Sequence, residues 1–377
     1  MKYQITKQVD VTRTARVMQM EGIFQMQPKL TSKSEWVINL PIEDFSWNVG
    51  LIVGPSGSGK TTVARRVFAD AYWANEQVWD EKHSIVDDFP AEGSIKSITA
   101  MLSSVGFSSP PAWLRPYSAL STGEQFRVTV ARALMEAELG KSEVICIDEF
   151  TSVIDRQVAQ IGSASVAKAI RKNKSSRLVA VSCHSDIIEW LQPDWLYEPA
   201  TNTFTRRSVQ RRPTLELEIY RTTTETWDIF KKHHYLDSNI NKGAKCFVGC
   251  INGRPAGFIG VLMFPHPIAS AQTWRISRIV CLPDFQGLGI GRIMVDYIAS
   301  IFEASKHHCS IVTGHPSLIT SLFNSDEWEM RRKPSVVNAP SKKTGLSMTA
   351  ATTRMTAGFR YIGSAQEQDA RLFGVTA

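Results

Sequence analysis

Short apolar runs divide the first half of the chain, and each run ends in glycine-rich or polar residues. The runs cover residues 51–53, 144–147 and 178–183, and a helical pattern follows the first of them. Continuous apolar runs of this kind are typical of strands that are buried on both faces, as in a parallel sheet covered by helices. The pattern therefore predicts an α/β domain in the first half.

The second half has a different order of elements. An apolar-polar alternation predicts a strand, helical spacing follows it, and Asn252-Gly253 lies between two further strand patterns. Asn-Gly between two such runs is the strongest short signal for a β-hairpin. The pattern predicts the order β-α-β-β-β-α, an α+β domain. Its elements are a strand at 215–220, a helix at 224–235, the hairpin, a strand at 274–282 and a helix at 293–304.

Chain length and composition favour two soluble domains. The 377 residues exceed what one core usually organises, and 43% hydrophobic with 21% charged residues is ordinary for a globular protein. Residues 205–213 are polar, basic and end in proline, which predicts a linker between domains at 1–204 and 214–377. No window approaches ~18 uninterrupted apolar residues, and the first residues lack a signal sequence. We expect a cytoplasmic protein without a membrane partner.

The net charge of +7 belongs to the C-terminal part. Residues 1–210 contain 23 basic and 23 acidic residues, whereas residues 211–377 contain 20 and 13. The stretch 330–366 has seven basic residues and no acidic one. A solvated basic face is one interpretation, and a surface for the phosphate backbone of nucleic acid is the other. The candidate nucleic-acid residues are Arg331, Arg332, Lys333, Lys342 and Lys343.

A phosphate-binding loop follows the first apolar run. Glycines let successive backbone N–H groups surround phosphate, Lys60 reaches the β- and γ-phosphates, and the Thr61 hydroxyl coordinates Mg²⁺. The sequence therefore predicts that ATP or GTP binds here. The candidate residues are Gly54, Pro55, Ser56, Gly57, Ser58, Gly59, Lys60, Thr61 and Thr62.

The ends of the other two runs supply hydrolytic chemistry. Asp148 and Glu149 follow residues 144–147, where Asp148 can hold Mg²⁺ and Glu149 can orient or deprotonate the attacking water. His184 follows the third run and is placed to contact the γ-phosphate. We therefore expect nucleotide hydrolysis, with Glu149 and His184 as candidate catalytic residues.

Residues 120–134, LSTGEQFRVTVARAL, resemble the signature segment of ABC-type ATPases. Residues 149–155, EFTSVID, look like the run from Walker B to the D-loop in that family. The resemblance covers about residues 20–200. It implies ATP as the nucleotide, roles for Ser121, Gly123 and Asp155 in binding it, and a homodimer in which Ser121 and Gly123 clamp the γ-phosphate held by the partner's loop.

One position departs from the family pattern. Transporter cassettes have a glutamine about forty residues after the loop lysine, whereas this chain has Asp87 and Asp88 in the comparable segment. Either an aspartate takes that Mg²⁺-side role or the role is absent.

The second glycine-rich turn lies between the predicted strand 274–282 and the helix after it. Gln286-x-x-Gly289-x-Gly291 lacks the spacing of a dinucleotide fold and resembles the acyl-CoA pyrophosphate loop of GNAT acetyltransferases over about residues 212–365. The resemblance implies acetyl-CoA or another acyl-CoA as cofactor, held by loop N–H groups and by a strand edge that pairs with pantetheine. The candidate residues are Ile279, Val280, Cys281, Gln286, Gly287, Leu288, Gly289, Ile290, Gly291 and Arg292.

The groups that move protons during acyl transfer are less evident. An amine must be positioned against a thioester, one group must take its proton, and another must protonate the leaving thiolate. His234 and His315 are the leading candidates, because residues at strand and helix ends line such clefts. His233, Tyr235 and Tyr361 are further candidates.

The whole chain resembles ABC-type ATPases fused to a GNAT acetyltransferase and, more loosely, phage DNA-modification acyltransferases of the Mom type. The leading hypothesis is an ATP-driven acyltransferase that acts on a base of nucleic acid, where unstacking costs a few kcal/mol. One rival is a GNAT enzyme that acts on a protein or small amine under control of the ABC part. Another is a non-catalytic nucleic-acid-binding ATPase.

Overall fold

The computed structural model describes residues 2–28, 30–173, 176–207, 214–234, 238–264, 273–305, 307–336 and 355–376. It divides into two compact units, each assembled from several segments of the chain. The first unit comprises Met1–Gln77, Glu136–Val153 and Ala167–Arg212. The second comprises Val78–Met135, Ile154–Val166 and Pro213–Ala377.

The core of the first unit is a six-stranded sheet with the order β4-β5-β6-β3-β7-β8. All neighbouring strands are parallel except β7 and β8, which are antiparallel. The apolar runs noted in the sequence form its buried central strands, as a sheet covered on both faces requires. The strands are β3 (Val49–Val53), β4 (Tyr72–Trp73), β5 (Val144–Ile147), β6 (Arg177–Ser182), β7 (Trp195–Glu198) and β8 (Thr203–Arg206).

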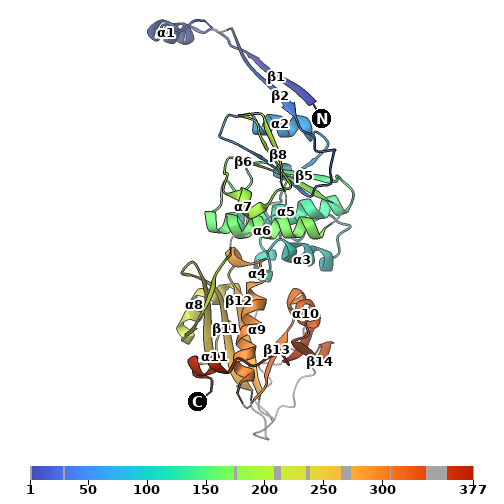
Figure 1. The fold of residues 1–377 in the computed structure, drawn as a ribbon, viewed down its shortest axis with the longest axis vertical. Helices are drawn as coiled ribbons and strands as arrows, with labels where there is room; N and C mark the ends of the chain where they lie inside the picture. The colour runs from blue at the N-terminus through green and yellow to red at the C-terminus, as the bar shows by residue number, and fades with distance from the viewer. Residues whose placement is uncertain are drawn as a thin grey trace. The chain divides into compact units, whose positions relative to one another are not determined.

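A long antiparallel hairpin extends from this unit, with β1 (Lys2–Asp10) paired along its whole length with β2 (Thr31–Asn39). Helix α1 (Ala15–Ile23) lies at the far end of the hairpin and has no buried residue (Figure 1). Near the opposite end, the side chains of Tyr3, Ile5 and Trp36 pack against the core of the sheet. The hairpin therefore brings residues from before the phosphate-binding loop close to that loop.

The helices of the ATPase half follow the polar and apolar spacing of the sequence. Helix α2 begins directly after the glycine-rich loop, and α5 begins at the signature segment. The α-helices of this half are α2 (Lys60–Val67), α3 (Ile95–Ser104), α4 (Pro110–Trp113), α5 (Thr122–Glu138), α6 (Arg156–Lys172) and α7 (Ile187–Leu191). Its 3₁₀ turns are η1 (Ala74–Glu76) and η2 (Tyr117–Ala119).

The second unit contains a seven-stranded sheet with the order β14-β15-β13-β12-β11-β10-β9. Its strand pairs are antiparallel except β12 and β13, which are parallel. Helix α9 (Ile290–Glu303) buries its apolar face against this sheet. The strands are β9 (Leu217–Thr222), β10 (Lys245–Ile251), β11 (Arg254–Phe264), β12 (Thr273–Cys281), β13 (Cys309–Thr313), β14 (Trp328–Ser335) and β15 (Thr356–Tyr361). The remaining helices are α8 (Trp227–Phe230), α10 (Pro316–Phe323) and α11 (Glu367–Leu372).

The sequence pattern and the observed elements agree in order but differ at their ends. The hairpin turn is confirmed, because Asn252 and Gly253 both have positive φ, 51° and 72°, as a type I′ turn requires. The helix expected at 224–235 is divided into η3 (Thr224–Thr226), α8 and η4 (Lys231–His233). Helix α9 begins three residues earlier than expected, because Gly289 and not a later residue is its N-cap.

Candidate functional site

The glycine-rich loop of the first unit joins β3 to α2. Gly59 is the N-cap of α2 with φ 88° and ψ 11°, a left-handed conformation that favours glycine. No side chain caps the first N–H groups of α2, and its first turn has no acidic residue. The helix therefore begins with unsatisfied donors and the positive end of its dipole, which together favour a bound anion.

Two side chains of this loop are arranged for phosphate. The Lys60 side chain is buried, and its Nζ donates to the Pro55 carbonyl at 2.9 Å, so the ammonium lies over the loop. The Ser58 hydroxyl is buried and has no hydrogen-bond partner within the described ranges. An orphaned hydroxyl beside a retained ammonium is a polar cradle that fits the phosphates of a nucleotide.

Asp148 and Glu149 lie at the end of β5, on the same edge of the sheet as the loop. β5 pairs with β6 and β6 pairs with β3, all parallel, so their carboxyl ends lie side by side. The Asn75 side chain fixes this segment: Nδ2 donates to the Asp148 carbonyl at 3.0 Å, and Oδ1 accepts from the Asp148 N–H at 2.7 Å. Sequence reasoning missed Asn75, which precedes its partner by 73 residues.

Glu149 has an uncommon backbone conformation. Its φ is 50°, positive for a residue other than glycine, and its Oε2 accepts from the Ser152 hydroxyl at 2.6 Å. Such conformations cost of order 1–3 kcal/mol and persist where surrounding contacts determine them. The Asp148 Oδ1 accepts from the Glu149 N–H at 2.9 Å. Both carboxylates are thus held in place at the sheet edge.

The end of β6 connects this acidic segment to the loop. The Ser182 hydroxyl donates to the Phe150 carbonyl at 3.1 Å, and the Ser182 carbonyl accepts from the Gly54 N–H at 3.4 Å. The His184 N–H donates to the Ser182 hydroxyl at 3.2 Å. The structure therefore brings the loop, Asp148-Glu149 and His184 to one sheet edge, where Thr61 and Asp148 are the residues that would hold Mg²⁺.

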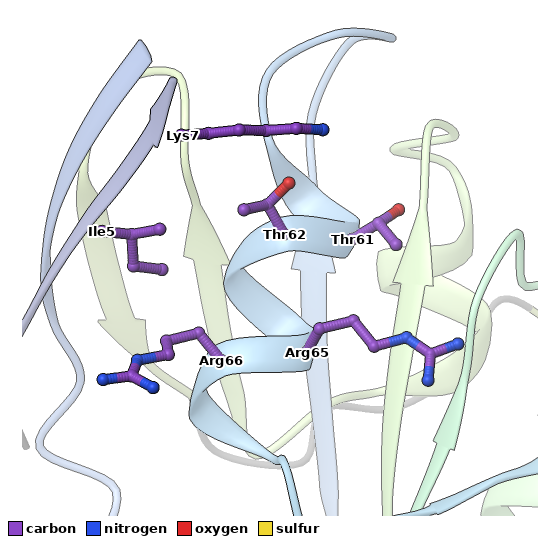
Figure 2. A pocket seen from close by; sticks show the side chains of 6 residues that line it. All are labelled: Ile5, Lys7, Thr61, Thr62, Arg65 and Arg66. Atoms are coloured by element: carbon purple, nitrogen blue, oxygen red, sulfur yellow. The ribbon is translucent and has the colours of Figure 1, made fainter. Parts of the chain in front are cut away.

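Trp36 is a second residue that sequence reasoning missed. Its Nε1 donates to the Ser58 carbonyl at 3.2 Å, and its ring lies where a side chain on Gly59 would have to go. Because β2 pairs with β1, the same hairpin also lines a pocket of about 440 Å³ beside α2. Figure 2 shows Ile5 and Lys7 on one side, with Thr61, Thr62, Arg65 and Arg66 from α2 on the other.

The signature segment belongs to the second unit, at the start of α5. Ser121 and Glu124 form a reciprocal cap: Ser121 donates to the Glu124 carboxylate from its N–H at 2.9 Å and its hydroxyl at 3.0 Å. Gly123 is buried. Asp155 caps the start of α6 by accepting from the Gln157 N–H at 2.9 Å. The expected ATP contacts of Ser121, Gly123 and Asp155 stay predictions.

Asp87 and Asp88 also belong to the second unit. Asp87 accepts from the Ser84 hydroxyl at 2.5 Å, and Asp88 accepts from the Asp80 N–H at 3.2 Å. Burial raises the pKa of the Asp88 carboxyl above its usual value. These bonds give both carboxylates a local structural role, and the question of a Mg²⁺-side role stays open.

The second glycine-rich turn repeats the backbone geometry of the first. Gly289 is the N-cap of α9 with φ 87° and ψ 12°, no side chain caps the helix, and its first turn has no acidic residue. A methyl group on Gly289 would meet nothing within 4 Å. The N–H groups of residues 288–292 therefore begin a helix beside open space, as an anion-binding turn requires.

The sheet opens next to this turn. β12 pairs with β11 as far as Cys281, but it pairs with β13 only at Trp274, Arg275 and Ile276. The edge of β12 at Ile279, Val280 and Cys281 is thus unpaired on the β13 side. An extended ligand such as pantetheine can add to such an edge.

The two leading acyl-transfer candidates lie in different surroundings. His234 is buried, with its ring centroid 5.4 Å from that of Trp227. His315 is the N-cap residue of α10 after β13, and because β12 and β13 are parallel it lies at the sheet edge where the glycine-rich turn begins. Burial lowers the pKa of His315, opposed by a hydrogen bond with the Ser108 backbone. A neutral imidazole at this place can accept a proton.

The basic residues of the candidate nucleic-acid surface lie on β14, at the edge of the sheet. Arg331 pairs with Glu329 at 2.7 Å, and Arg332 donates to the Thr356 hydroxyl at 2.6 Å. Lys333 is exposed. Lys342 and Lys343 lie outside the described residues. Charged side chains on an edge strand also prevent pairing with other chains, which is an independent reason for their presence.

Comparisons with known proteins agree with this division of chemistry. Residues 212–316 match the family model described as Acetyltransferase (GNAT) family. A search of curated proteins found no match. The predicted fold class is confirmed: the chain is α/β, with a P-loop ATPase half that resembles ABC cassettes and a GNAT domain after it.

Solved structures similar to the chain are ABC ATPase subunits. A cobalt transport ATP-binding protein, cbiO-2, is 17% identical, covering 50% of this chain and 78% of its own, with a TM-score of 0.35. A bacterial ABC transporter cassette, described as dimeric, is 15% identical, covering 44% and 89%, with a TM-score of 0.33. The cbiO1 subunit of an ABC transporter complex from Clostridium perfringens is 17% identical, covering 41% and 74%, with a TM-score of 0.31.

In the described part of the chain, no helix has the length and apolar content needed to span a membrane.

Proposed function

We propose that this chain is an ABC-type ATPase coupled to acyl-CoA-dependent N-acyl transfer. The observation that carries the proposal is the pair of matched glycine caps. Gly59 and Gly289 share one backbone conformation, (88°, 11°) and (87°, 12°), and each begins a helix that no side chain caps. Two anion-binding turns of the same construction, in two units with different sheets, suit a nucleotide in one and the CoA pyrophosphate in the other.

In the ATPase half, each residue at the sheet edge has a role that its position supports. Lys60 and the N–H groups of the loop bind phosphate, and Mg²⁺, held by Thr61 and Asp148, neutralises charge on the phosphates. Glu149 orients the attacking water. Ser121 and Gly123 contact the nucleotide bound by a second copy, so that hydrolysis proceeds in a homodimer.

The Glu149→Gln variant tests the ATPase half. It keeps the shape of the side chain but removes the carboxylate, so we expect retained ATP binding, lost hydrolysis and an ATP-dependent dimer in size-exclusion chromatography. Glu143→Gln is the matched control, because Glu143 is exposed and pairs only at the surface with Arg177 at 3.2 Å. Normal hydrolysis in Glu149→Gln would contradict the assigned role.

In the GNAT half, the proposed reaction is acyl transfer to an amine. The amine nitrogen attacks the thioester carbonyl, the C–N bond forms and the C–S bond breaks, the amine loses a proton, and CoA leaves as its thiol. The unpaired edge of β12 aligns the thioester arm, and the turn before α9 holds the pyrophosphate. His234 and His315 are the proposed proton carriers.

Calorimetry with acetyl-CoA tests this half. Gly289→Glu places a carboxylate in the open space before α9, so steric exclusion and charge repulsion should abolish binding. Gly253→Glu is the matched control, since Gly253 also has positive φ, 72°, with nothing within 4 Å of an added methyl group. Absence of acetyl-CoA binding in the wild type would refute the acyl-transfer proposal.

We propose a nucleic-acid base as the acceptor, on the grounds of charge. The C-terminal part carries the whole net charge of +7, and a phosphate backbone responds to such a field. Incubation with labelled acetyl-CoA, ATP, and DNA or RNA, followed by mass spectrometry of nucleosides, tests this assignment. An acylated base is the expected product.

A protein or small amine is a second candidate acceptor, favoured by one observation. Arg331 and Arg332 already have partners, in Glu329 and Thr356, which weakens their case as phosphate ligands. Label found in peptides or small amines, and none in nucleosides, would select this alternative.

A further inference from the structure

Within the second unit, the turn after α3 contacts the beginning of the proposed acyl-CoA loop. The Ser108 N–H donates to the Gln286 side-chain Oε1 at 2.5 Å, and Gln286 Nε2 donates to the Cys281 carbonyl at 2.8 Å. A methyl group built on Gly106 would lie 2.6 Å from the Gln286 carbonyl oxygen, and one built on Gly287 would lie 2.7 Å from the Gly106 Cα. The two backbones therefore approach at a distance that only glycine permits.

Arg127 holds the segment just before this loop. It lies on α5, four residues after Gly123, and its guanidinium donates to the carbonyls of Pro283 and, at 3.0 Å, Asp284. The side chain is fully buried, and burial lowers its pKa to about 10. A buried cation that is satisfied by two consecutive carbonyls fixes the backbone that accepts from it, because losing those bonds strands the charge.

These contacts hold one end of the loop and leave the other open. Residues 283–287 lie against Arg127, Gly106 and Ser108, whereas Gly289 is exposed with nothing within 4 Å of an added methyl group. His315, the proposed proton carrier, also contacts the Ser108 backbone. The arrangement thus positions the phosphate-facing N–H groups without covering them.

We propose that Arg127 and the Gly106 turn are positioning elements for the acyl-CoA loop. The helix that begins with the ATPase signature residues thereby sets the affinity for acyl-CoA. This inference rests on the proposed acyl-transfer function and deepens it, since it assigns control of the acyl-CoA site to residues outside that site.

The decisive comparison uses two glycines with the same backbone conformation. Gly106 and Gly140 have φ of 84° and 83°, so alanine strains both equally, but nothing lies within 4 Å of a methyl group on Gly140. In the full-length protein, Gly106→Ala should raise the Kd for acetyl-CoA about tenfold relative to Gly140→Ala. In the transfer assay, the KM for acetyl-CoA should rise more than kcat falls.

Arg127 gives a second, independent variant. Arg127→Met removes both bonds to the carbonyls and should weaken acetyl-CoA binding, and Arg127→Lys, which keeps the charge and one donor, should restore part of the affinity. A merely structural role would not order the acetyl-CoA affinities of the three proteins in this way.

The outcomes separate this inference from the proposed function. If the wild type does not bind acetyl-CoA, the proposed function fails; if it binds and Gly106→Ala matches Gly140→Ala, the positioning inference fails. Should both variants fail to fold, hydrogen exchange on the wild type decides. The Ser108 amide, which donates to Gln286, must then be protected, and rapid exchange there would overturn the inference.

Discussion

Replacing Asn75 by alanine should slow ATP hydrolysis while leaving ATP affinity nearly unchanged. The Asn75 side chain makes two hydrogen bonds with the backbone of Asp148, at 2.7 and 3.0 Å, and touches the acidic segment from outside the phosphate-binding loop. Without these bonds, the chain between β5 and Glu149 loses a lateral restraint. Glu149 then orients water in a smaller fraction of molecules.

The size of the effect follows from the two bonds. A hydrogen bond contributes about 0.5–1.5 kcal/mol net, so the pair contributes about 1–3 kcal/mol. If all of this energy served positioning, kcat would fall about 5- to 150-fold, at about 1.4 kcal/mol per factor of ten. Because Asn75 is exposed and water can replace its side chain, we expect the lower end, about five- to tenfold.

Steady-state ATPase kinetics on purified Asn75→Ala measure both quantities. Asn173→Ala is the control, since the Asn173 side chain bonds to Glu138 at 2.8 Å and neither residue lies in the acidic segment. Unchanged kcat in Asn75→Ala would refute the view that this side chain positions the catalytic carboxylate. A rise in the KM for ATP with constant kcat would instead place Asn75 in nucleotide binding.

Three further predictions concern other parts of the chain. Trp36→Ala removes a hydrogen bond and a ring from the phosphate-binding loop, so the KM for ATP should rise about fivefold; an unchanged KM would exclude Trp36 from the site. Replacing Arg331, Arg332, Lys333, Lys342 and Lys343 with serine should weaken DNA or RNA binding and flatten its salt dependence, by ~0.9 in log–log slope per lost duplex phosphate contact; an unchanged slope would favour a protein or small-amine acceptor. Burial lowers the pKa of His315, so the unfolded chain takes up its proton first as pH falls below about 6.5, and stability is lost on acidification. Urea midpoints between pH 7 and 5 should therefore fall less in His315→Gln than in wild type, and equal falls would contradict this assignment.

The phosphate-binding half was the more predictable part, because its signals are local. The loop at 54–61 and the acidic pair after β5 follow apolar runs directly, and the parallel sheet then brings their ends together. Residues that act across long separations gave no such signal. Trp36 contacts the loop from a hairpin strand 22 residues earlier, and an aromatic residue within a strand pattern is ordinary.

In the second unit, the hairpin at Asn252-Gly253 was predictable because both residue types tolerate positive φ. The start of α9 was placed three residues late, because the glycines at 287–291 interrupt the apolar spacing although the helix already begins at Ile290. The division of residues 224–233 into three short helical pieces was also not predicted. Amphipathic spacing indicates which face is buried, but it does not distinguish 3₁₀ from α turns.

The sequence also does not reveal why each loop needs its particular glycines. Gly289 is required for its positive φ alone, since a methyl group there meets open space, whereas Gly287 is required for close approach as well, because Gly106 and Ser165 lie against it. In the first loop, Gly57 serves only the backbone conformation, and Gly59 both caps α2 and lies against Trp36. Each loop thus has one glycine that faces open space and one that is held from behind by a distant segment. Alanine at the open position should cost mainly backbone strain, and alanine at the held position should also displace the supporting segment, so the same substitution separates phosphate binding from loop support.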